Sequence, residues 1–321
     1  MHSFKGLRGA FASIALGLAL GAPAQAGFPE KPVQLIIPFA PGDTDQMLRP
    51  ITEKMGQYLG QPIVMNYKPG AGGGIGAAYT ASAPADGYTI VGSSPGALVV
   101  VPLANKEIKY TTDSFAPVAA ISLGGMMIVA SSKSRYKTLA DVVADAKARP
   151  DGVSYGTSGA MGISHLLGET FASEAGIQLR HIPFQGSAPA VTALLGGHTD
   201  IAVSAVGPAQ AHIQSGGLRP LAIFSSKRLA AYPDVPTLRE LGYDVGSPTI
   251  YGLMAPRDTP PQVIDTLYQA ARKVVADQGG EVNKTLGTIG AEVSVLSPQE
   301  YGAYLREQRA LFSKAIGLIR E

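Results

Sequence analysis

The 321-residue chain contains no cysteine and no tryptophan. The lack of cysteine excludes disulfides, thiolate catalysis, thiolate metal sites and iron–sulfur clusters, so the fold must rely on packing. Without tryptophan, an aromatic platform for a sugar ring would need Tyr or Phe. No stretch beyond the N-terminal segment is apolar over the ~18 residues that a membrane-spanning helix needs. The composition, 45% hydrophobic and 16% charged, is that of a globular protein long enough for two domains.

Residues 1–26 have the features of a secretory signal peptide. Lys5 and Arg8 form a basic start, Phe11–Leu20 is a short apolar run, and Ala24-Gln25-Ala26 is a cleavage site. We therefore expect export to the periplasm, with the mature chain beginning at Gly27. Removing the two cations takes the formal charge from +2 to +2 − 2 = 0. A neutral mature chain argues against nucleic acid or an anionic membrane as partner.

Short apolar strands alternate with turns and amphipathic helices along the mature chain. The first block has predicted strands 33–39, 63–66 and 88–92, and predicted helices 44–59 and 75–83. A second block of the same kind has strands 153–156, 180–184, 200–204 and 218–224, and helices 138–149, 163–175, 187–195 and 208–215. Further strands are expected at 115–121, 126–131 and 251–255, and helices at 261–276 and 298–319. This alternation predicts an α/β fold with two mostly parallel sheets, whose ligand lies beyond the carboxyl ends of the strands.

A glycine-rich loop, 66–78, follows one of these strands. It holds five glycines, Gly70, Gly72, Gly73, Gly74 and Gly76. Because glycine permits positive φ and close approach, such a loop can direct several backbone N–H groups at one anion. The loops 42–44, 93–96, 157–162 and 204–207 also follow strands and are rich in Ser, Thr and Gly. Together they predict an anion pocket built from hydroxyl and backbone donors.

Two catalytic alternatives arise from short motifs. Gly72-x-Gly74-x-x-Ala77 matches a dinucleotide fingerprint but lacks the acidic residue expected about 20 positions later. Gly92-Ser93-Ser94-Pro95-Gly96 matches the nucleophile elbow of a serine hydrolase, with Ser94 as nucleophile. Pro95, however, has no N–H to contribute to an oxyanion hole. The hydrolase remains the alternative to a binding protein.

The histidines of the mature chain favour neither a metal site nor a catalytic pair. His165, His181, His198 and His212 are scattered, with no metal-ligand spacing, and a structural role is the simpler interpretation. We expect no metal and no cofactor.

The motifs together resemble a known family. They are PFAPGDTD (38–45), NYKPGAGGGIGA (66–77), APADGYTIVGSSPG (83–96), DSFAPVA (113–119), SYGTSGAMGISHL (154–166), HIPFQGSAPAVTALLGGHTDIA (181–202) and DVPTLRELGY (234–243). In content, order and spacing they resemble the tripartite tricarboxylate transporter receptors, the Bug-type periplasmic solute-binding proteins. The resemblance implies a two-lobed Venus-flytrap fold of type II. It places lobe 1 at 27–126 plus 252–321 and lobe 2 at 127–251, with the ligand cleft between them.

The resemblance also implies a set of ligand-binding residues. In lobe 1 they are Pro41, Gly42, Asp43, Thr44, Asp45, Gly72, Gly73, Gly74, Ile75, Ser93 and Ser94. In lobe 2 they are Thr157, Ser158 and Gly159, with Gln185, Ser204 and Ala205 deeper in the cleft.

The partners implied are a small carboxylate and the membrane permease subunits of a tripartite tricarboxylate transporter. Many family members carry an acid or amide near the position of Ser204-Ala205, where an ammonium group would bind. Its absence here favours a plain di- or tricarboxylate, or an aromatic carboxylate, over an amino acid. With no sustained heptad pattern, we expect a monomer.

Overall fold

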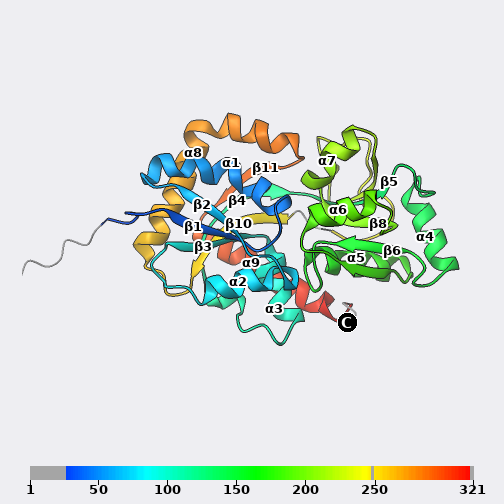
Figure 1. Ribbon diagram of the computed structural model, residues 1–321, viewed down its shortest axis with the longest axis horizontal. Helices are drawn as coiled ribbons and strands as arrows, with labels where there is room; N and C mark the ends of the chain where they lie inside the picture. Colours follow the sequence, from blue (N-terminus) through cyan, green and yellow to red (C-terminus); the bar gives the residue numbers. More distant parts are fainter. Residues whose placement is uncertain (1–26, 247–248, 319–321) are drawn as a thin grey trace, which may run out of the picture.

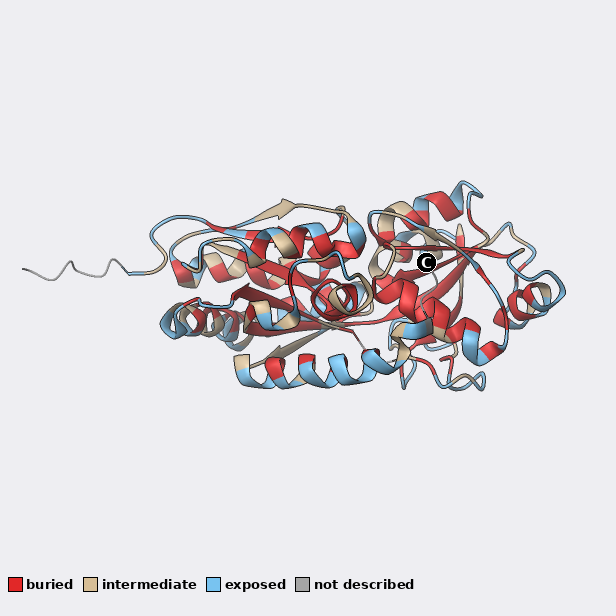
Figure 2. Cartoon of the chain, turned by 90° about the horizontal axis from the view of Figure 1, so that it is seen from below, coloured by how far each residue is buried: buried red, intermediate tan, exposed pale blue. Residues whose placement is uncertain are grey.

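Two mixed β-sheets flanked by helices form two lobes that lie side by side (Figure 1). The computed structural model describes residues 27–246 and 249–318, so the predicted signal peptide lies outside the described residues. In Figure 2 the strands of both sheets are mostly buried, and the exposed residues lie in loops and on the outer faces of helices. Each lobe therefore has a sheet at its centre, as the alternating pattern predicts.

The sheet of lobe 1 has six strands in the order β11-β4-β10-β3-β1-β2. β1 pairs in parallel with β2 and β3, whereas β10 is antiparallel to β3 and β4, and β11 is antiparallel to β4. The strands are β1 (Val33–Ile37), β2 (Ile63–Tyr67), β3 (Thr89–Ser93), β4 (Phe115–Gly124), β10 (Thr249–Pro256) and β11 (Glu292–Leu296). The helices of this part are α1 (Asp43–Leu59), α2 (Gly74–Ala81), α3 (Val101–Ala104), α8 (Pro261–Thr288) and α9 (Pro298–Ala315).

The sheet of lobe 2 has five strands in the order β7-β6-β8-β5-β9. β6 is parallel to β7 and β8, and β5 runs antiparallel to both β8 and β9. The strands are β5 (Met126–Ser131), β6 (Ser154–Thr157), β7 (Arg180–Pro183), β8 (Ile201–Ala205) and β9 (Leu218–Phe224). The helices are α4 (Leu139–Ala148), α5 (Ile163–Ala175), α6 (Ser187–Leu195) and α7 (Val206–Gln214).

The chain crosses between the sheets twice. β4 ends at Gly124 in the first sheet and β5 begins at Met126 in the second, so one crossing is at Gly125. The other crossing lies between β9 and β10. Met126 was predicted in lobe 1 but belongs to the sheet of lobe 2, and residues 249–251 were predicted in lobe 2 but belong to the sheet of lobe 1. The predicted boundaries, 126/127 and 251/252, are therefore within three residues of the sheet boundaries.

Helix α1 shows how the sequence pattern produces the local structure. Its apolar side chains lie on one face and are buried in the core of lobe 1, as the spacing predicts: Met47, Leu48, Ile51, Met55 and Leu59. The Asp45 carboxylate accepts the N–H of Gly42 at 2.7 Å and so caps the first turn. The helix continues through Pro50 and ends at Gly60, which has φ 70°.

Four features differ from the sequence expectations. The sheets are mixed and not mostly parallel, since β5, β10 and β11 run antiparallel to their neighbours. Strand β11 was not predicted, because its residues are at best half-buried and the apolar alternation is weak. Helix α8 extends to Thr288, twelve residues past the predicted end. After Pro95 the chain forms a fully buried π-helix, Gly96–Val100, which continues into α3. A π-helix has no sequence period that distinguishes it from a buried strand or helix.

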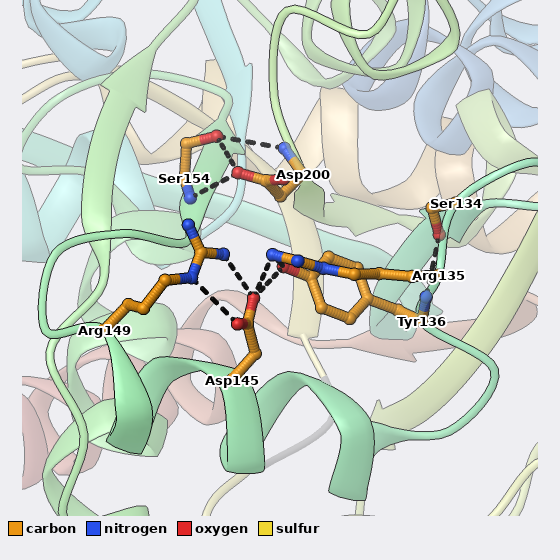
Figure 3. A network of polar contacts seen from close by, with 7 residues as sticks. All are labelled: Ser134, Arg135, Tyr136, Asp145, Arg149, Ser154 and Asp200. Carbon is orange, nitrogen blue, oxygen red and sulfur yellow. Dashed lines mark hydrogen bonds and ion pairs between the residues drawn. The ribbon is translucent and has the colours of Figure 1, made fainter.

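A network of charged and polar side chains connects α4 to neighbouring segments of lobe 2 (Figure 3). Asp145 on α4 accepts two hydrogen bonds from Arg149, at 2.9 and 2.6 Å, another from the Tyr136 hydroxyl at 2.6 Å, and one from Arg135. Arg149 is the largest cause of the lowered pKa of Asp145, about 2. This network lies near the start of β6, the opposite end of the sheet from the cleft, so we assign it to anchoring α4.

Candidate functional site

Most of the predicted ligand-binding residues follow the carboxyl ends of β1, β2, β3, β6 and β8, and the two lobes meet across these loops. The backbone N–H of Ala40 in lobe 1 donates to the carbonyl oxygen of Gln185 in lobe 2 at 2.8 Å. Beside this bond, a Cβ added to Gly42 would lie 2.7 Å from the Cβ of Ala188. One side of the cleft is therefore shut by contact between residues 40–42 and 185–188.

The glycine-rich loop makes a second contact with lobe 2. A Cβ on Gly72 would lie 2.4 Å from the carbonyl oxygen of Ala160 and 3.3 Å from the backbone nitrogen of Gly162. A Cβ on Gly159 would lie 2.8 Å from Cα of Gly72. Gly72 also has φ +62°, a conformation that other residues adopt at a cost. The two backbones approach this closely because neither residue has a side chain.

Two further contacts join the two lobes. The Gln46 side chain on α1 lies against Gly207 of α7, where an added Cβ would be 2.4 Å from its Oε1. Ile163, the first residue of α5, packs on Gly96, with an added Cβ 3.2 Å from its side chain. Contacts between the lobes thus lie beside the ends of β1, β2, β3, β6 and β8, and we interpret the structure as a closed conformation of the two lobes.

Six hydroxyl side chains of the predicted site are buried: Thr44, Ser93, Ser94, Thr157, Ser158 and Ser204. Thr44 Oγ1 and Ser93 Oγ have no hydrogen-bond partner among the described residues. The Ser158 and Ser204 hydroxyls do have partners, Ser164 Oγ at 2.8 Å and the Ala205 carbonyl oxygen at 2.9 Å. Because a buried hydroxyl without a partner is costly, the first two are the ones that a ligand would satisfy.

The two acids of the first loop have protein partners. Asp45 accepts the N–H of Gly42 and the hydroxyl of Tyr67, at 2.7 and 3.1 Å, so its carboxylate shapes the loop. Asp43 accepts the hydroxyl of Tyr251 on β10 at 3.0 and 3.1 Å. Burial raises the pKa of Asp43 to about 7, although the Tyr251 hydrogen bond opposes this rise. The Asp43 carboxyl is therefore partly protonated near neutral pH.

Three predicted site residues lie at the rim. The Ile75 side chain is 54% exposed, because it is on the outer face of α2. Pro41 and Gln185 are also exposed, and Gln185 contributes its carbonyl oxygen to the contact between the lobes. Gln185 had been expected deeper in the cleft, and the structure places it at the closing edge. Gly72, Gly73 and Gly74 are buried, and Gly73 packs inside lobe 1 on Ala97 and Phe39.

Sequence reasoning missed the residues that support the loop after β6. His181 lies 2.6 Å from the Thr157 hydroxyl through Nε2, and its ring stacks on that of His165. The sequence showed two single histidines 16 positions apart, a spacing that carries no signal. The closing partners Ala160 and Gly186 were missed for a similar reason, since a contact between backbones leaves no side-chain pattern.

The contacts of Ser94 and the placement of His, Asp and Glu side chains bear on the catalytic and metal-binding alternatives. The contacts described for Ser94 Oγ include the N–H of Gly96 at 3.4 Å and neither a histidine nor a carboxylate. Within residues 27–246 and 249–318, no group of three or more His, Asp and Glu residues could hold a metal ion. In the same ranges no helix is long and apolar enough to cross a membrane.

Comparison with known proteins gives the family. Residues 47–319 match the model of the tripartite tricarboxylate transporter family receptor. The chain is 34% identical to Protein BugT of Bordetella pertussis over 299 residues, covering 92% of this chain and 90% of the relative.

Solved structures agree. The periplasmic binding protein BugD is 30% identical with a TM-score of 0.85, covering 92% of this chain and all of its own. MatC from Rhodopseudomonas palustris with bound malate is 27% identical with a TM-score of 0.85, covering 90% of this chain and all of its own. These matches confirm the two-lobed type II fold, and the neighbours are binding proteins, not enzymes, so the hydrolase alternative is wrong. The chain belongs to the tripartite tricarboxylate transporter receptor family.

Proposed function

We propose that this protein is an extracytoplasmic receptor that captures a small di- or tricarboxylate between its lobes and delivers it to a tripartite tricarboxylate permease. The observation that carries the proposal is the pair of buried, unpartnered hydroxyls, Thr44 in the first turn of α1 and Ser93 at the end of β3, on the side of lobe 1 that contacts lobe 2. A carboxylate accepts hydrogen bonds and never donates them, so it matches such a site.

The donors of the proposed site are hydroxyls and backbone N–H groups. The loops 41–45, 72–75, 93–94, 157–159 and 204–205 contain no Lys or Arg. Thr44 lies in the first turn of α1, where the helix dipole favours an anion. We infer that charge recognition depends on oriented dipoles, and that Ser93 and Thr44 donate to the same carboxylate.

The closeness of the lobes favours a small ligand. Gly72 and Gly159 are in van der Waals contact, so the closed cleft does not extend between them. No acid or amide stands at Ser204-Ala205 to receive an ammonium group. Malate, named for the related MatC structure, has the expected size and chemistry. An aromatic carboxylate is the other acid class to test.

The experiment is a binding screen on the mature chain, without the signal peptide. Thermal unfolding is measured with succinate, malate, adipate, citrate and benzoate, and with the neutral diamide of succinate as the matched control. At about 100 times Kd, a true ligand stabilises the fold by about 2.7 kcal/mol, which raises Tm by roughly 4 °C. Stabilisation by a carboxylate but not by the diamide supports the proposal, and no response to any of the acids contradicts it.

Delivery and location are tested in cells. We expect to find the mature chain in the periplasmic fraction. It should be a monomer on its own, and it should bind the permease subunits when ligand is present. Scattering from the purified chain should show a smaller radius of gyration with saturating ligand. An unchanged profile with a ligand known to bind would contradict closure.

A further inference from the structure

Two histidines of lobe 2 stack directly behind the loop that closes on Gly72. The rings of His165 on α5 and His181 on β7 have centroids 3.6 Å apart and planes inclined by 10°. His165 is 2% exposed, and His181 is half-buried. The pair belongs neither to the predicted ligand set nor to a metal site, and its arrangement calls for another explanation.

The pair holds both ends of the loop 157–162. At the start of the loop, His181 Nε2 lies 2.6 Å from the Thr157 hydroxyl. At the end, His165 Nδ1 accepts the N–H of Met161 at 3.1 Å, where Met161 has φ 59°. Between them, Ser164 Oγ accepts the N–H of Ser158 at 3.0 Å. This loop carries Ala160 and Gly159, the residues that touch Gly72 in the closed cleft.

The Thr157 hydroxyl has one proton and two contacts that can take it. Its oxygen lies 3.3 Å from the carbonyl oxygen of Gly159, which can only accept, and 2.6 Å from His181 Nε2, whose role depends on the tautomer of the ring. If the proton goes to Gly159, the contact with His181 is a donation from Nε2–H to the Thr157 oxygen. His165 accepts at Nδ1, and its own proton is therefore on Nε2.

The surroundings keep both rings neutral and fixed. Burial lowers the pKa of His165 to about 4, and burial together with the neighbouring His165 lowers that of His181 to about 3. The Tyr155 ring from β6 lies 5.1 Å from the His181 ring. Glu169 Oε1 lies 4.0 Å from His165 Nε2 and accepts the Tyr155 hydroxyl at 2.5 Å.

We propose that His181 is a positioning residue for ligand capture: its Nε2–H donates to the Thr157 oxygen, so that the single Thr157 proton is not taken by the imidazole and can turn from the Gly159 carbonyl oxygen to a ligand carboxylate. His165 holds the other end of the loop and fixes the plane of the His181 ring by stacking. The ligand part of this inference rests on the proposed function, whereas the tautomer of His181 does not. In the ligand-free protein the Thr157 proton goes to Gly159, and on binding it turns to the carboxylate.

The first test reads the tautomer directly. In protein labelled with ¹⁵N histidine, long-range ¹H–¹⁵N spectra at pH 7 distinguish protonated from unprotonated ring nitrogens. The mature chain has four histidines, and His198→Gln and His212→Gln assign their signals by elimination. We expect Nε2–H for both His165 and His181 without ligand. An Nδ1–H tautomer of His181 overturns the proposal, whether or not any carboxylate binds.

The second test measures ligand coupling, with malate as the probe. Adding malate should shift the His181 ring nitrogens and leave those of exposed His198 unchanged. His181→Phe, which fills the space without a donor, should weaken malate binding by roughly 3- to 10-fold. His181→Gln, whose amide can place an N–H near the same position, should restore most of the affinity, and His198→Gln serves as the matched control.

The outcomes separate the two proposals. If malate and the other acids of the screen fail to bind the unaltered protein, the proposed function fails, and the tautomer measurement still decides the assignment of His181. If malate binds, but His181→Phe binds it as tightly as His198→Gln does, the positioning role is refuted. A His181→Phe chain that does not fold leaves the shift of the His181 nitrogens on malate addition as the deciding result.

Discussion

Replacing Gly72 by alanine should block closure of the cleft while leaving lobe 1 folded. The added Cβ would lie 2.4 Å from the Ala160 carbonyl oxygen in lobe 2, about 1 Å closer than normal contact. Inside lobe 1 it would meet Val101 Cγ2 at 3.1 Å, the end of a side chain that can shift. The serious clash is therefore with the other lobe, and it disappears when the lobes move apart.

The size of the effect follows from two separate costs. An alanine at φ +62° costs about 1 kcal/mol of folding stability through the loop backbone itself, and this cost does not come from the contact with lobe 2. Pushing back the Ala160 carbonyl resembles overpacking, which costs about 1–3 kcal/mol, and this cost falls on the closed state alone. Since the ligand binds the closed state, affinity should fall roughly 5- to 150-fold.

Gly60→Ala is the matched control. Gly60 ends α1 at φ +70°, and nothing lies within 4 Å of its added Cβ, so this substitution carries the backbone cost without the clash. Chemical unfolding without ligand should show a similar loss of stability in the two variants. Titration calorimetry with the tightest-binding acid of the screen should show weaker binding for Gly72→Ala alone. Equal affinities in the two variants would refute the closed-state contact on which this reasoning depends.

Three further predictions concern buried polar groups. Ser93→Ala should leave the stability of the ligand-free protein unchanged or raise it, because the hydroxyl has no partner among the described residues. The same substitution should weaken carboxylate binding about 10-fold, as measured by calorimetry. The control is Ser173→Ala at an exposed position, which should change neither stability nor affinity. The folded pKa of Asp43, about 7, exceeds the ordinary aspartate pKa of 3.8, so the folded state binds more protons between these pH values and stability falls as the pH rises through them. Asp43→Asn should remove that fall in a pH series of thermal unfolding, and an unaltered series would contradict the raised pKa. For His165 and His181 the sign is opposite: the unfolded state binds more protons below pH 6.5, so stability falls as the pH drops toward 4, and His181→Gln should reduce the fall.

The sequence predicted most elements because local signals and burial agreed. Both α5 and α6 have a glycine before the helix and a glycine after it, and these glycines predicted where the helices end. In the structure the two helices begin and end at the predicted residues. The order of the strands in each sheet was harder to predict, since it depends on contacts between strands that are distant in the sequence. The antiparallel position of β10 between β3 and β4 has no local signature.

For the site, the sequence predicted the loops better than the side chains within them. Each loop follows a strand, and the topology alone brings strand ends to one edge. Whether a given residue points inward depends on helix phase and loop shape, and Ile75 was misplaced for this reason: α2 begins at Gly74 and turns it outward. The ligand-binding role of the residues that do face the cleft stays a prediction.

The interface between the lobes gives a physical reason for the predicted dependence of closure on ligand. Among the ion pairs described for residues 27–246 and 249–318, none joins one lobe to the other across the cleft. Apolar side chains of both lobes share one buried cluster, which includes Leu166 and Phe312. At the rim, by contrast, the contacts are backbone and small-residue contacts, such as Ala40 with Gln185 and Gly72 with Gly159. These contacts give shape complementarity but little energy of their own, while the buried hydroxyls of Thr44 and Ser93 lack partners in the closed state. A carboxylate that supplies the missing acceptors stabilises the closed state relative to the open one, which is the differential affinity that a population shift requires.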